Sequence, residues 1–559
     1  MKNIYKEYIK EIEEIKKDKS NTEGSFAPIL KDLIEKISNY NVKVVLQSRA
    51  ETLQPDMKIK NKQDGIIGYI ETKHPRVLID TAENTEQFIE YKKHFSNLIL
   101  TNFEEFVLYR KGERVMNSNI KKDIKKVETL FSIFFSSAIS DTTTTQELAR
   151  DLAEKAKILK KEIYEEIIKP NETPIKSIYK VFKEYLISTL NEEEFADMYA
   201  QTLVYGLLTA KFYHKEGPFN RFSAFSDIPK TTGILRDIFM YITLQDIPKP
   251  IESVINNITE LLSQKDIRNF ANDNLIFDFY ETFLAYYNPE ERKRKGVYYT
   301  PEPVIEYIIN SVDEIIKNEF NYSEGLANEN VTVLDPAAGT MGFLVAAMDK
   351  AIKNYKYSDD INKLIKERIL NNFNAFEIML APYVIGHLRL LLFLQQKGYN
   401  LSENEKLKIF LTNTLELNAV QDKDQYYFQS LIEETNEAML VKKQKIFVII
   451  GNPPYSHKST HTPFINKLME DYKKELNEKS IVQLSNDYIK FIRFSQWKMD
   501  NQEKGIVAMI TNNSFLYGIL FRIMRKSLLD SFNKMYILNL HGDARLQEKT
   551  PEGGKDENV

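Results

Sequence analysis

The chain has 559 residues, of which 43% are hydrophobic and none is cysteine, and its formal net charge is −4 at pH 7. This length predicts two to four domains, because single hydrophobic cores seldom grow beyond about 250 to 300 residues. The lack of cysteine excludes disulfides and thiolate-bound zinc, and the near balance of charges means that any binding of nucleic acid must come from local patches.

The first 37 residues predict two amphipathic helices. Residues 1–20 are charged throughout, unlike a signal peptide, and no apolar run in the chain reaches the roughly 20 residues that span a bilayer. We therefore expect a cytoplasmic protein with no membrane partner. Asn21 or Thr22 can cap the second helix, and Glu23 lies in its first turn, where the helix dipole favours a carboxylate.

A hairpin follows, and its strand ends carry two carboxylates and a lysine. An Asp-Gly turn signal separates two short apolar runs, so Asp56 stands at the start of one strand and Glu71 and Lys73 lie on its partner. Glu71 and Lys73 share a face because they are two residues apart, whereas Thr72 points the opposite way. Such a group can bind Mg²⁺ and activate a water for phosphodiester hydrolysis. A solvated hairpin face is the alternative, because charged residues make up 28% of the chain.

The Pro-Asp and Glu-Thr-Lys patterns at these positions resemble the core of PD-(D/E)xK nucleases. Gln87 and Tyr91 lie four residues apart on one face of a predicted helix, and they resemble the QxxxY feature of the same class. The resemblance implies a Mg²⁺-dependent endonuclease domain over residues 1–125, in which Asp56, Glu71 and Lys73 are catalytic. The implied metal ligands are Asp56, Glu71 and, more weakly, Glu23.

Residues 126–290 repeat apolar side chains at helical spacing and predict a helical connector. They contain no G-x-x-x-x-G-K-[ST] phosphate loop, so an ATP-driven translocase is not supported. At Thr300 and Pro301 a new helix is predicted, with Thr300 as its cap and Pro301 at its first position. Tyr298 and Tyr299 stand just before it.

Residues 331–343 predict a strand, a loop of small residues and a helix that begins at Phe343. The loop carries Asp335, Pro336, Ala337, Gly339 and Gly342. Small residues let a ligand approach the backbone closely, and the loop leads into the N-terminus of a helix. The spacing is not G-x-G-x-x-G, so a dinucleotide is the poorer match.

Two further strands also end in polar residues. Glu377 follows the second strand, where an acidic group usually binds ribose hydroxyls, although it can equally cap the following helix. Asn413 and Thr414 follow the third strand. The fourth strand, residues 446–450, ends in Asn452-Pro453-Pro454-Tyr455, in which the Asn452 amide and the Pro453 carbonyl can be held as acceptors beside the Tyr455 ring. Two acceptors beside an aromatic ring suit a planar base that carries an exocyclic amine.

The Asn452-Pro453-Pro454-Tyr455 motif resembles the catalytic motif of amino-methylating DNA methyltransferases, most often the adenine-N6 enzymes. The loop after the first strand resembles the D-P-A-x-G-x-G-x-F cofactor loop of this family, with one extra residue before its last glycine. The resemblance implies binding of S-adenosylmethionine. The implied cofactor contacts are Tyr298, Tyr299, Thr300, Pro301, Asp335, Pro336, Ala337, Gly339, Gly342, Glu377, Asn413 and Thr414.

Together these features predict an α/β multidomain protein similar to single-chain type IIG restriction-modification enzymes of bacteria. A Rossmann-like methyltransferase domain, residues 291–559, follows the helical connector and the nuclease-like domain, and double-stranded DNA is the expected partner. About 18 residues remain after His541, so we expect the target recognition domain to be missing or supplied by a separate chain. Two alternatives stay open: a methyltransferase for another amine, such as cytosine N4, RNA or a protein glutamine, and an inactive DNA-binding remnant.

Overall fold

The computed structural model describes residues 2–18, 20–38, 41–46, 55–61, 66–95, 97–110, 112–135, 145–215, 217–229, 232–244, 247–263, 265, 267, 273–287, 300–355, 360–402, 404–417, 429–455, 462–478, 480–541, 548–549 and 553–554. The chain divides into two compact units, which we describe separately. The N-terminal unit comprises Met1–Glu162, His214–Ala224 and Gln245–Arg268, and the C-terminal unit comprises the remaining residues. The predicted connector is therefore shared between the two units, and the three-domain division remains a prediction.

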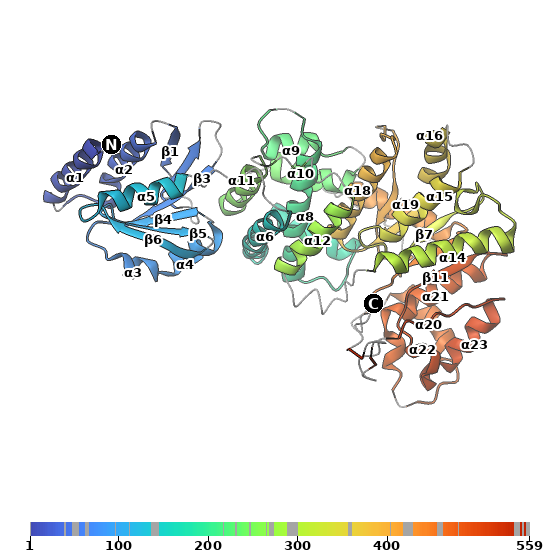
Figure 1. Ribbon diagram of the computed structural model, residues 1–559. Helices are drawn as coiled ribbons and strands as arrows, with labels where there is room; N and C mark the ends of the chain where they lie inside the picture. The colour runs from blue at the N-terminus through green and yellow to red at the C-terminus, as the bar shows by residue number, and fades with distance from the viewer. Residues whose placement is uncertain are drawn as a thin grey trace. The chain divides into compact units, whose positions relative to one another are not determined.

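The N-terminal unit is built on a six-stranded sheet (Figure 1). Its strands are β1 (Val42–Leu46), β2 (Met57–Asn61), β3 (Ile66–Thr72), β4 (Asn97–Thr101), β5 (Glu105–Arg110) and β6 (Glu113–Asn119), which lie side by side in chain order. Neighbours are antiparallel except β3 and β4, which are parallel. The hairpin of β2 and β3 is as predicted, and β4 and β5 form a second antiparallel pair.

Helices cover both faces of this sheet. One face packs against α1 (Lys2–Lys17), α2 (Ala27–Ile37) and α5 (Ile124–Phe135) in the larger apolar core. The other face packs against α3 (Ile79–Glu83) and α4 (Glu86–His94). The second helix begins later than predicted, because Glu23–Ser25 form a separate 3-10 turn and Phe26 is the residue that precedes α2.

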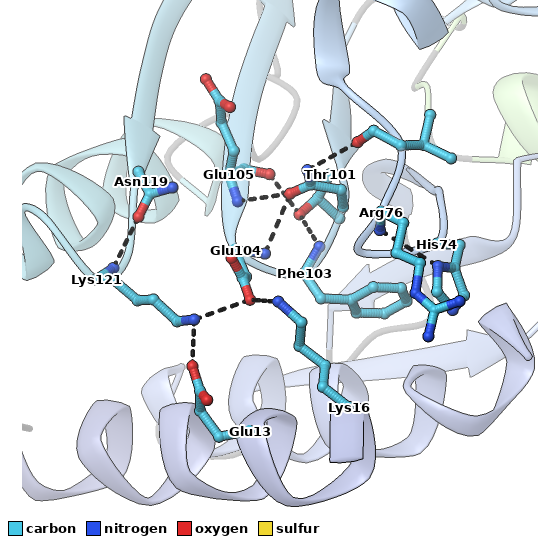
Figure 2. Close-up of polar contacts among 12 residues, drawn as sticks. Glu13, Lys16, His74, Arg76, Thr101, Phe103, Glu104, Glu105, Asn119 and Lys121 are labelled. Carbon is cyan, nitrogen blue, oxygen red and sulfur yellow. Dashed lines mark hydrogen bonds and ion pairs between the residues drawn. The ribbon is translucent and has the colours of Figure 1, made fainter. Parts of the chain in front are cut away.

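The turn between β4 and β5 connects the sheet to α1 through charged side chains. Figure 2 shows Lys16 of α1 and Lys121 meeting the carboxylate of Glu104 in this turn, and Lys121 also contacts Glu13. Phe103 adopts a positive φ of 69° and packs inward, so the turn presents its acidic residue to the helix.

Helices fill the region between the two sheets in sequence, as predicted. They are α6 (Thr145–Ile167), α7 (Pro174–Tyr185), α8 (Glu192–Tyr213), α9 (Arg221–Asp227), α10 (Gly233–Leu244), α11 (Lys249–Ser263) and α12 (Asp273–Tyr287). Within the C-terminal unit, α8 and α12 pack against α18 (Leu380–Gln396) and α10 packs against α19 (Gln429–Lys443). None of the helices among the described residues is long and apolar enough to cross a membrane.

The C-terminal unit contains a five-stranded parallel sheet in the order β11-β10-β7-β8-β9. Its strands are β7 (Val333–Asp335), β8 (Phe373–Glu377), β9 (Lys408–Leu411), β10 (Val448–Gly451) and β11 (Ile506–Met509). One face packs against α19, α20 (Pro463–Lys473) and α21 (Asp487–Asp500). The helices α14 (Glu302–Phe320), α15 (Gly342–Asn354) and α18 also contact the strands.

The strand order reverses between β7 and β10. From β7 the chain moves outward to β8 and β9, and it then returns to place β10 on the other side of β7. In open α/β sheets, ligands bind in the crevice outside the carboxyl ends of the strands at such a reversal. The predicted α/β fold with a Rossmann-like parallel sheet is therefore confirmed, and this edge is the place to look for a site.

Candidate functional site

The carboxyl edge of the parallel sheet brings together the polar strand ends that the sequence singled out. β7 ends at Asp335, β8 at Glu377 and β10 at Gly451, one residue before Asn452. Asn413 follows β9 by two residues. These four ends come from strands that are hydrogen-bonded neighbours, so the loops after them face one common crevice.

The loop after β7 is shaped by two residues with left-handed backbone. Gly339 has φ of 52°, and a Cβ built on it would meet nothing within 4 Å, so the backbone there faces open space. Met341 has φ of 67° and buries its side chain against Gly386 of α18, where a Cβ would lie 2.5 Å from Met341 Cγ. The helix begins at Gly342 and not at Phe343 as predicted, so the extra residue of the loop is absorbed at Met341.

Glu377 holds this loop in place. Its Oε2 accepts a hydrogen bond from Gly339 N (2.7 Å), and its Oε1 accepts from Ile378 N (2.9 Å) and Met379 N (2.7 Å) at the start of α18. Burial raises the pKa of this carboxyl group, and these backbone donors act in the opposite direction. The alternative role at the helix start is thus present in the structure, and the ribose contact remains a prediction.

Asp335 lies at the point of strand reversal. Its Oδ1 accepts from Ala337 N (3.1 Å), and a Cβ on Gly451 would lie 2.6 Å from the same oxygen. Burial, with a smaller contribution from Glu377, raises the pKa of Asp335 to about 8. Only glycine fits at position 451, because Asp335 fills the space beside it and the backbone there has φ of 151°.

The loop after β9 is held by a lysine that sequence reasoning missed. Lys442 of α19 is buried, and its Nζ donates to Thr412 Oγ1 (2.9 Å), Asn413 O (2.7 Å) and Glu416 O (3.1 Å). Thr414 Oγ1 donates to Pro336 O (2.5 Å), which joins this loop to the loop after β7. Asn413 Nδ2 is buried and has no hydrogen-bond partner among the described residues.

The side chains of Asn452 and Tyr455 form one hydrogen-bonded group after β10. Tyr455 OH lies 2.8 Å from Asn452 Oδ1 and 3.1 Å from Ile510 O, and can donate to either. Asn452 Nδ2 donates to Thr300 Oγ1 (2.9 Å). The ring of Tyr455 lies 5.9 Å from that of Tyr488, between centroids, at 39°. Burial raises the pKa of Tyr455, so its hydroxyl stays protonated and able to donate.

Tyr488 of α21 is a site residue that the sequence did not single out. Its hydroxyl hydrogen-bonds with Ser514 Oγ (2.9 Å), which lies in the polar segment after β11. Nothing in the local pattern of α21 marks this tyrosine, because it reads as one more apolar position of an ordinary helix.

The segment before α14 differs from its prediction. Pro301, and not Thr300, precedes the helix, and no side-chain hydrogen bond caps it. The Thr300 hydroxyl instead accepts from Asn452. Tyr298 and Tyr299 lie outside the described residues.

The nuclease-like residues of the N-terminal unit lie together at one end of β2 and β3. Lys73 Nζ donates to Glu71 Oε1 (2.5 Å), and Asp56 N donates to Glu71 Oε2 (3.3 Å). Burial, and then the neighbouring Asp56, raise the pKa of Glu71 to about 7, while Lys73 acts in the opposite direction. Thr72, expected on the opposite face, also reaches Asp56: its backbone N and its Oγ1 each lie 2.7 Å from Asp56 Oδ2.

The weaker candidates surround this group. Gln87 Nε2 donates to Tyr91 OH (2.8 Å), and burial with the nearby Glu71 carboxylate raises the pKa of Tyr91. Glu23 Oε1 lies 3.0 Å from Thr72 Oγ1. Across the described part of the chain, no three His, Cys, Asp or Glu side chains are arranged to hold a metal ion. A cation here would therefore rest on Asp56 and Glu71, with water or a DNA phosphate completing its ligands.

Known proteins resemble the C-terminal region in sequence. A family model described as N-6 DNA methylase matches residues 271–537. The type II methyltransferase M.BstVI of Geobacillus stearothermophilus is 26% identical over 247 residues, which are 44% of this chain and 38% of that protein. The methylase subunit of the type I restriction enzyme EcoEI of Escherichia coli is 26% identical over 119 residues, 21% of this chain and 20% of that subunit. The chain thus spans about two fifths or less of these curated relatives.

Solved structures share the fold at lower sequence identity. The chain in a DrdV–DNA complex has a TM-score of 0.52 and 20% identity, over 98% of this chain and 54% of that one. The ATP-dependent type ISP restriction-modification enzyme LlaBIII, bound to DNA, has a TM-score of 0.57 and 23% identity, over 78% of this chain and 29% of that one. Residues 271–537 thus match the N-6 DNA methylase family model, and these solved structures share the fold of the chain.

Proposed function

We propose that this chain is an S-adenosylmethionine-dependent DNA methyltransferase that acts on the N6 amine of adenine. The observation that carries the proposal is the position of Asn452 and Tyr455 directly after β10, at the strand reversal, beside the glycine loop after β7. A base that enters this crevice meets an amide oxygen, a carbonyl oxygen and an aromatic ring within one loop. Because duplex DNA hides its bases, the target adenine has to be flipped out of the stack to reach them.

The residues around the crevice fit S-adenosylmethionine, which supplies the methyl group when bound. The open space over Gly339 admits a ligand against the backbone. The buried Nδ2 of Asn413, which has no partner within the described ranges of the chain, can donate to an adenine ring nitrogen. The remaining cofactor contacts are those implied by the family resemblance, with Glu377 near the ribose and Thr300 and Pro301 just before α14.

The chain's own residues orient and activate the target amine. Asn452 Oδ1 and the Pro453 carbonyl accept hydrogen bonds from the amine, which draws its nitrogen towards a tetrahedral geometry and aims its lone pair at the methyl group. The same two oxygens stabilise the positive charge that develops on nitrogen during the in-line transfer. The methylated nitrogen then loses its proton to solvent, so no strong base is required beforehand.

The proposal predicts N6-methyladenine in DNA from methylation-free cells that express this chain. Single-molecule sequencing of that DNA should find the modification at one short motif, because a flipped base is chosen by its flanking sequence. Methylation of cytosine N4 alone would overturn the choice of base. Cofactor binding without any DNA modification would favour a methyltransferase for RNA or protein, or one whose recognition chain is separate. If the chain neither binds the cofactor nor modifies DNA, an inactive remnant would be favoured.

We further propose that the N-terminal unit hydrolyses DNA with Mg²⁺, as a type IIG-like endonuclease. The supporting observation is the joined group of Asp56, Glu71 and Lys73 at the ends of β2 and β3. Two carboxylates give a divalent cation the oxygen ligands that it prefers. Burial, and then the neighbouring Asp56 carboxylate, raise the pKa of Glu71.

Glu71→Gln is expected to abolish Mg²⁺-dependent cleavage of DNA and to leave methyl transfer unchanged, because the two groups of residues belong to different units. Cleavage would be followed by electrophoresis of plasmid DNA. Glu113→Gln is a matched control, since Glu113 lies exposed on β6 of the same sheet. Equal cleavage by wild type and Glu71→Gln would remove Glu71 from the active site.

A further inference from the structure

The Asn452 side chain presents different chemistry on its two sides. Its Oδ1 accepts hydrogen bonds and its Nδ2 donates them, and a half-turn of the amide exchanges the two atoms. An amine that is to be methylated donates through its hydrogens, so it must meet Oδ1. If Nδ2 faced the amine, two donors would oppose each other and the target would be held away from the reactive position.

Thr300 contacts the side of this amide that does not face Tyr455. Asn452 Nδ2 donates to Thr300 Oγ1 at 2.9 Å, although the two residues are 152 positions apart in the chain. Asn452 Oδ1, on the other side, lies 2.8 Å from Tyr455 OH. The amide therefore already has the orientation in which its oxygen can face a substrate.

The hydrogen bonds of this group rearrange consistently when an amine enters. Tyr455 OH can transfer its hydrogen bond from Asn452 Oδ1 to Ile510 O, which is 3.1 Å away and, as a carbonyl, can only accept. Asn452 Oδ1 is then free to accept from the amine, and Nδ2 keeps Thr300 Oγ1 as its acceptor. Asn452 Nδ2 has an acceptor in this arrangement only if residue 300 supplies an oxygen.

We propose that Thr300 is a positioning residue for methyl transfer, which fixes the Asn452 amide with its oxygen towards the target amine. This inference rests on the proposed methyltransferase function. It assigns to the Thr300 hydroxyl an action on the catalytic asparagine, in addition to any contact with the cofactor that the family resemblance implies. The hydroxyl is half-buried, and it joins the residue pair before α14 to the loop after β10.

The test compares wild type, Thr300→Val and Thr300→Ser at saturating cofactor and DNA. Valine keeps the shape and removes the acceptor, so the single-turnover rate of methyl transfer is expected to fall about tenfold, the usual effect of one lost hydrogen bond. Serine restores the oxygen and should recover most of the rate. The affinity for S-adenosylmethionine, measured by calorimetry in both variants, reports any cofactor contact of Thr300 separately and sets the concentration at which the cofactor is saturating.

Two results would overturn the inference. A loss of cofactor affinity in Thr300→Val, with an unchanged rate at saturation, would make Thr300 a cofactor contact alone. Equal rates for the valine and serine variants would show that the hydroxyl is not used. The methyltransferase function itself is judged separately, because its failure would appear as a lack of methyl transfer by the wild-type chain.

Discussion

Asn452→Ala is expected to lower the rate of methyl transfer by about 10²- to 10³-fold, the range seen when one preorganised group that stabilises transition-state charge is removed. Alanine removes Asn452 Oδ1, which accepts from the amine and from Tyr455 OH. It also removes Nδ2, which donates to Thr300 Oγ1. The rate would be measured in a single turnover at saturating S-adenosylmethionine, where substrate binding no longer limits it.

Cofactor affinity should be nearly unchanged in Asn452→Ala, because the loops that fit the cofactor are held by Glu377 and Lys442 and not by Asn452. Asn477→Ala is a suitable control, since Asn477 lies exposed after α20. An equal loss of cofactor binding and of methyl transfer would contradict the catalytic role and would place Asn452 among the residues that hold the loops.

The positions of the strand ends could be predicted from sequence because local patterns specify them. Each of β7, β8, β9 and β10 is a short apolar run that stops at a polar or small residue, and such a stop places that residue at the edge of a parallel sheet. The hairpin with Asp56 and Glu71 was also predictable from a local pattern, an Asp-Gly turn signal between two short apolar runs. The boundaries shifted by a residue or two, as at Gly342, because helix starts depend on backbone angles that composition does not reveal.

The residues that hold the site together could not be predicted, because their partners are far away in the chain. Thr300 looks like a helix cap in its local sequence, and only the fold places its hydroxyl against Asn452. Tyr488 and Lys442 look like ordinary positions of two helices. Their roles arise from contacts across the sheet edge, which no local periodicity records.

Lys442 is the most unusual of these residues, because burial of an ammonium group opposes folding. Burial lowers the pKa of Lys442 to about 7, with a smaller opposing effect of Glu416. In the unfolded chain the pKa returns to its ordinary value near 10.5. Between these two values the unfolded state binds a proton that the folded state does not, so the free energy of unfolding rises with pH.

A pH window isolates this contribution. Burial lowers the pKa of Lys498 to about 8, so Lys498 also makes the free energy of unfolding rise with pH. Burial raises the pKa values of Asp335 and Glu434 to about 8, so these two carboxyl groups lower the free energy of unfolding as pH rises through that value. At pH 8 the two carboxyl groups are half titrated, but they are common to wild type and variant, so their contribution cancels when the two are compared. Below about pH 9.5 tyrosines, with an ordinary pKa near 10, have not yet ionised in the unfolded chain.

Lys442→Met is therefore expected to reduce the rise in unfolding free energy between pH 8 and 9.5 by about 1.4 kcal/mol per pH unit, the value for one proton. The slope would be measured by urea unfolding at several pH values. Lys443→Met is the matched control, because Lys443 is the next residue of α19 and is exposed. An unchanged slope in Lys442→Met would mean that burial does not lower the pKa of Lys442 in the folded state.

The same variant should also weaken cofactor binding, at least about tenfold at neutral pH. Thr412 Oγ1 and Asn413 O lose their common donor, and each buried acceptor left without one costs about 1–3 kcal/mol. The loop can avoid that cost only by moving its carbonyls towards water, which displaces Asn413 and Thr414 from the crevice. Calorimetry with S-adenosylmethionine would detect this, and wild-type affinity in Lys442→Met would show that the loop does not contact the cofactor.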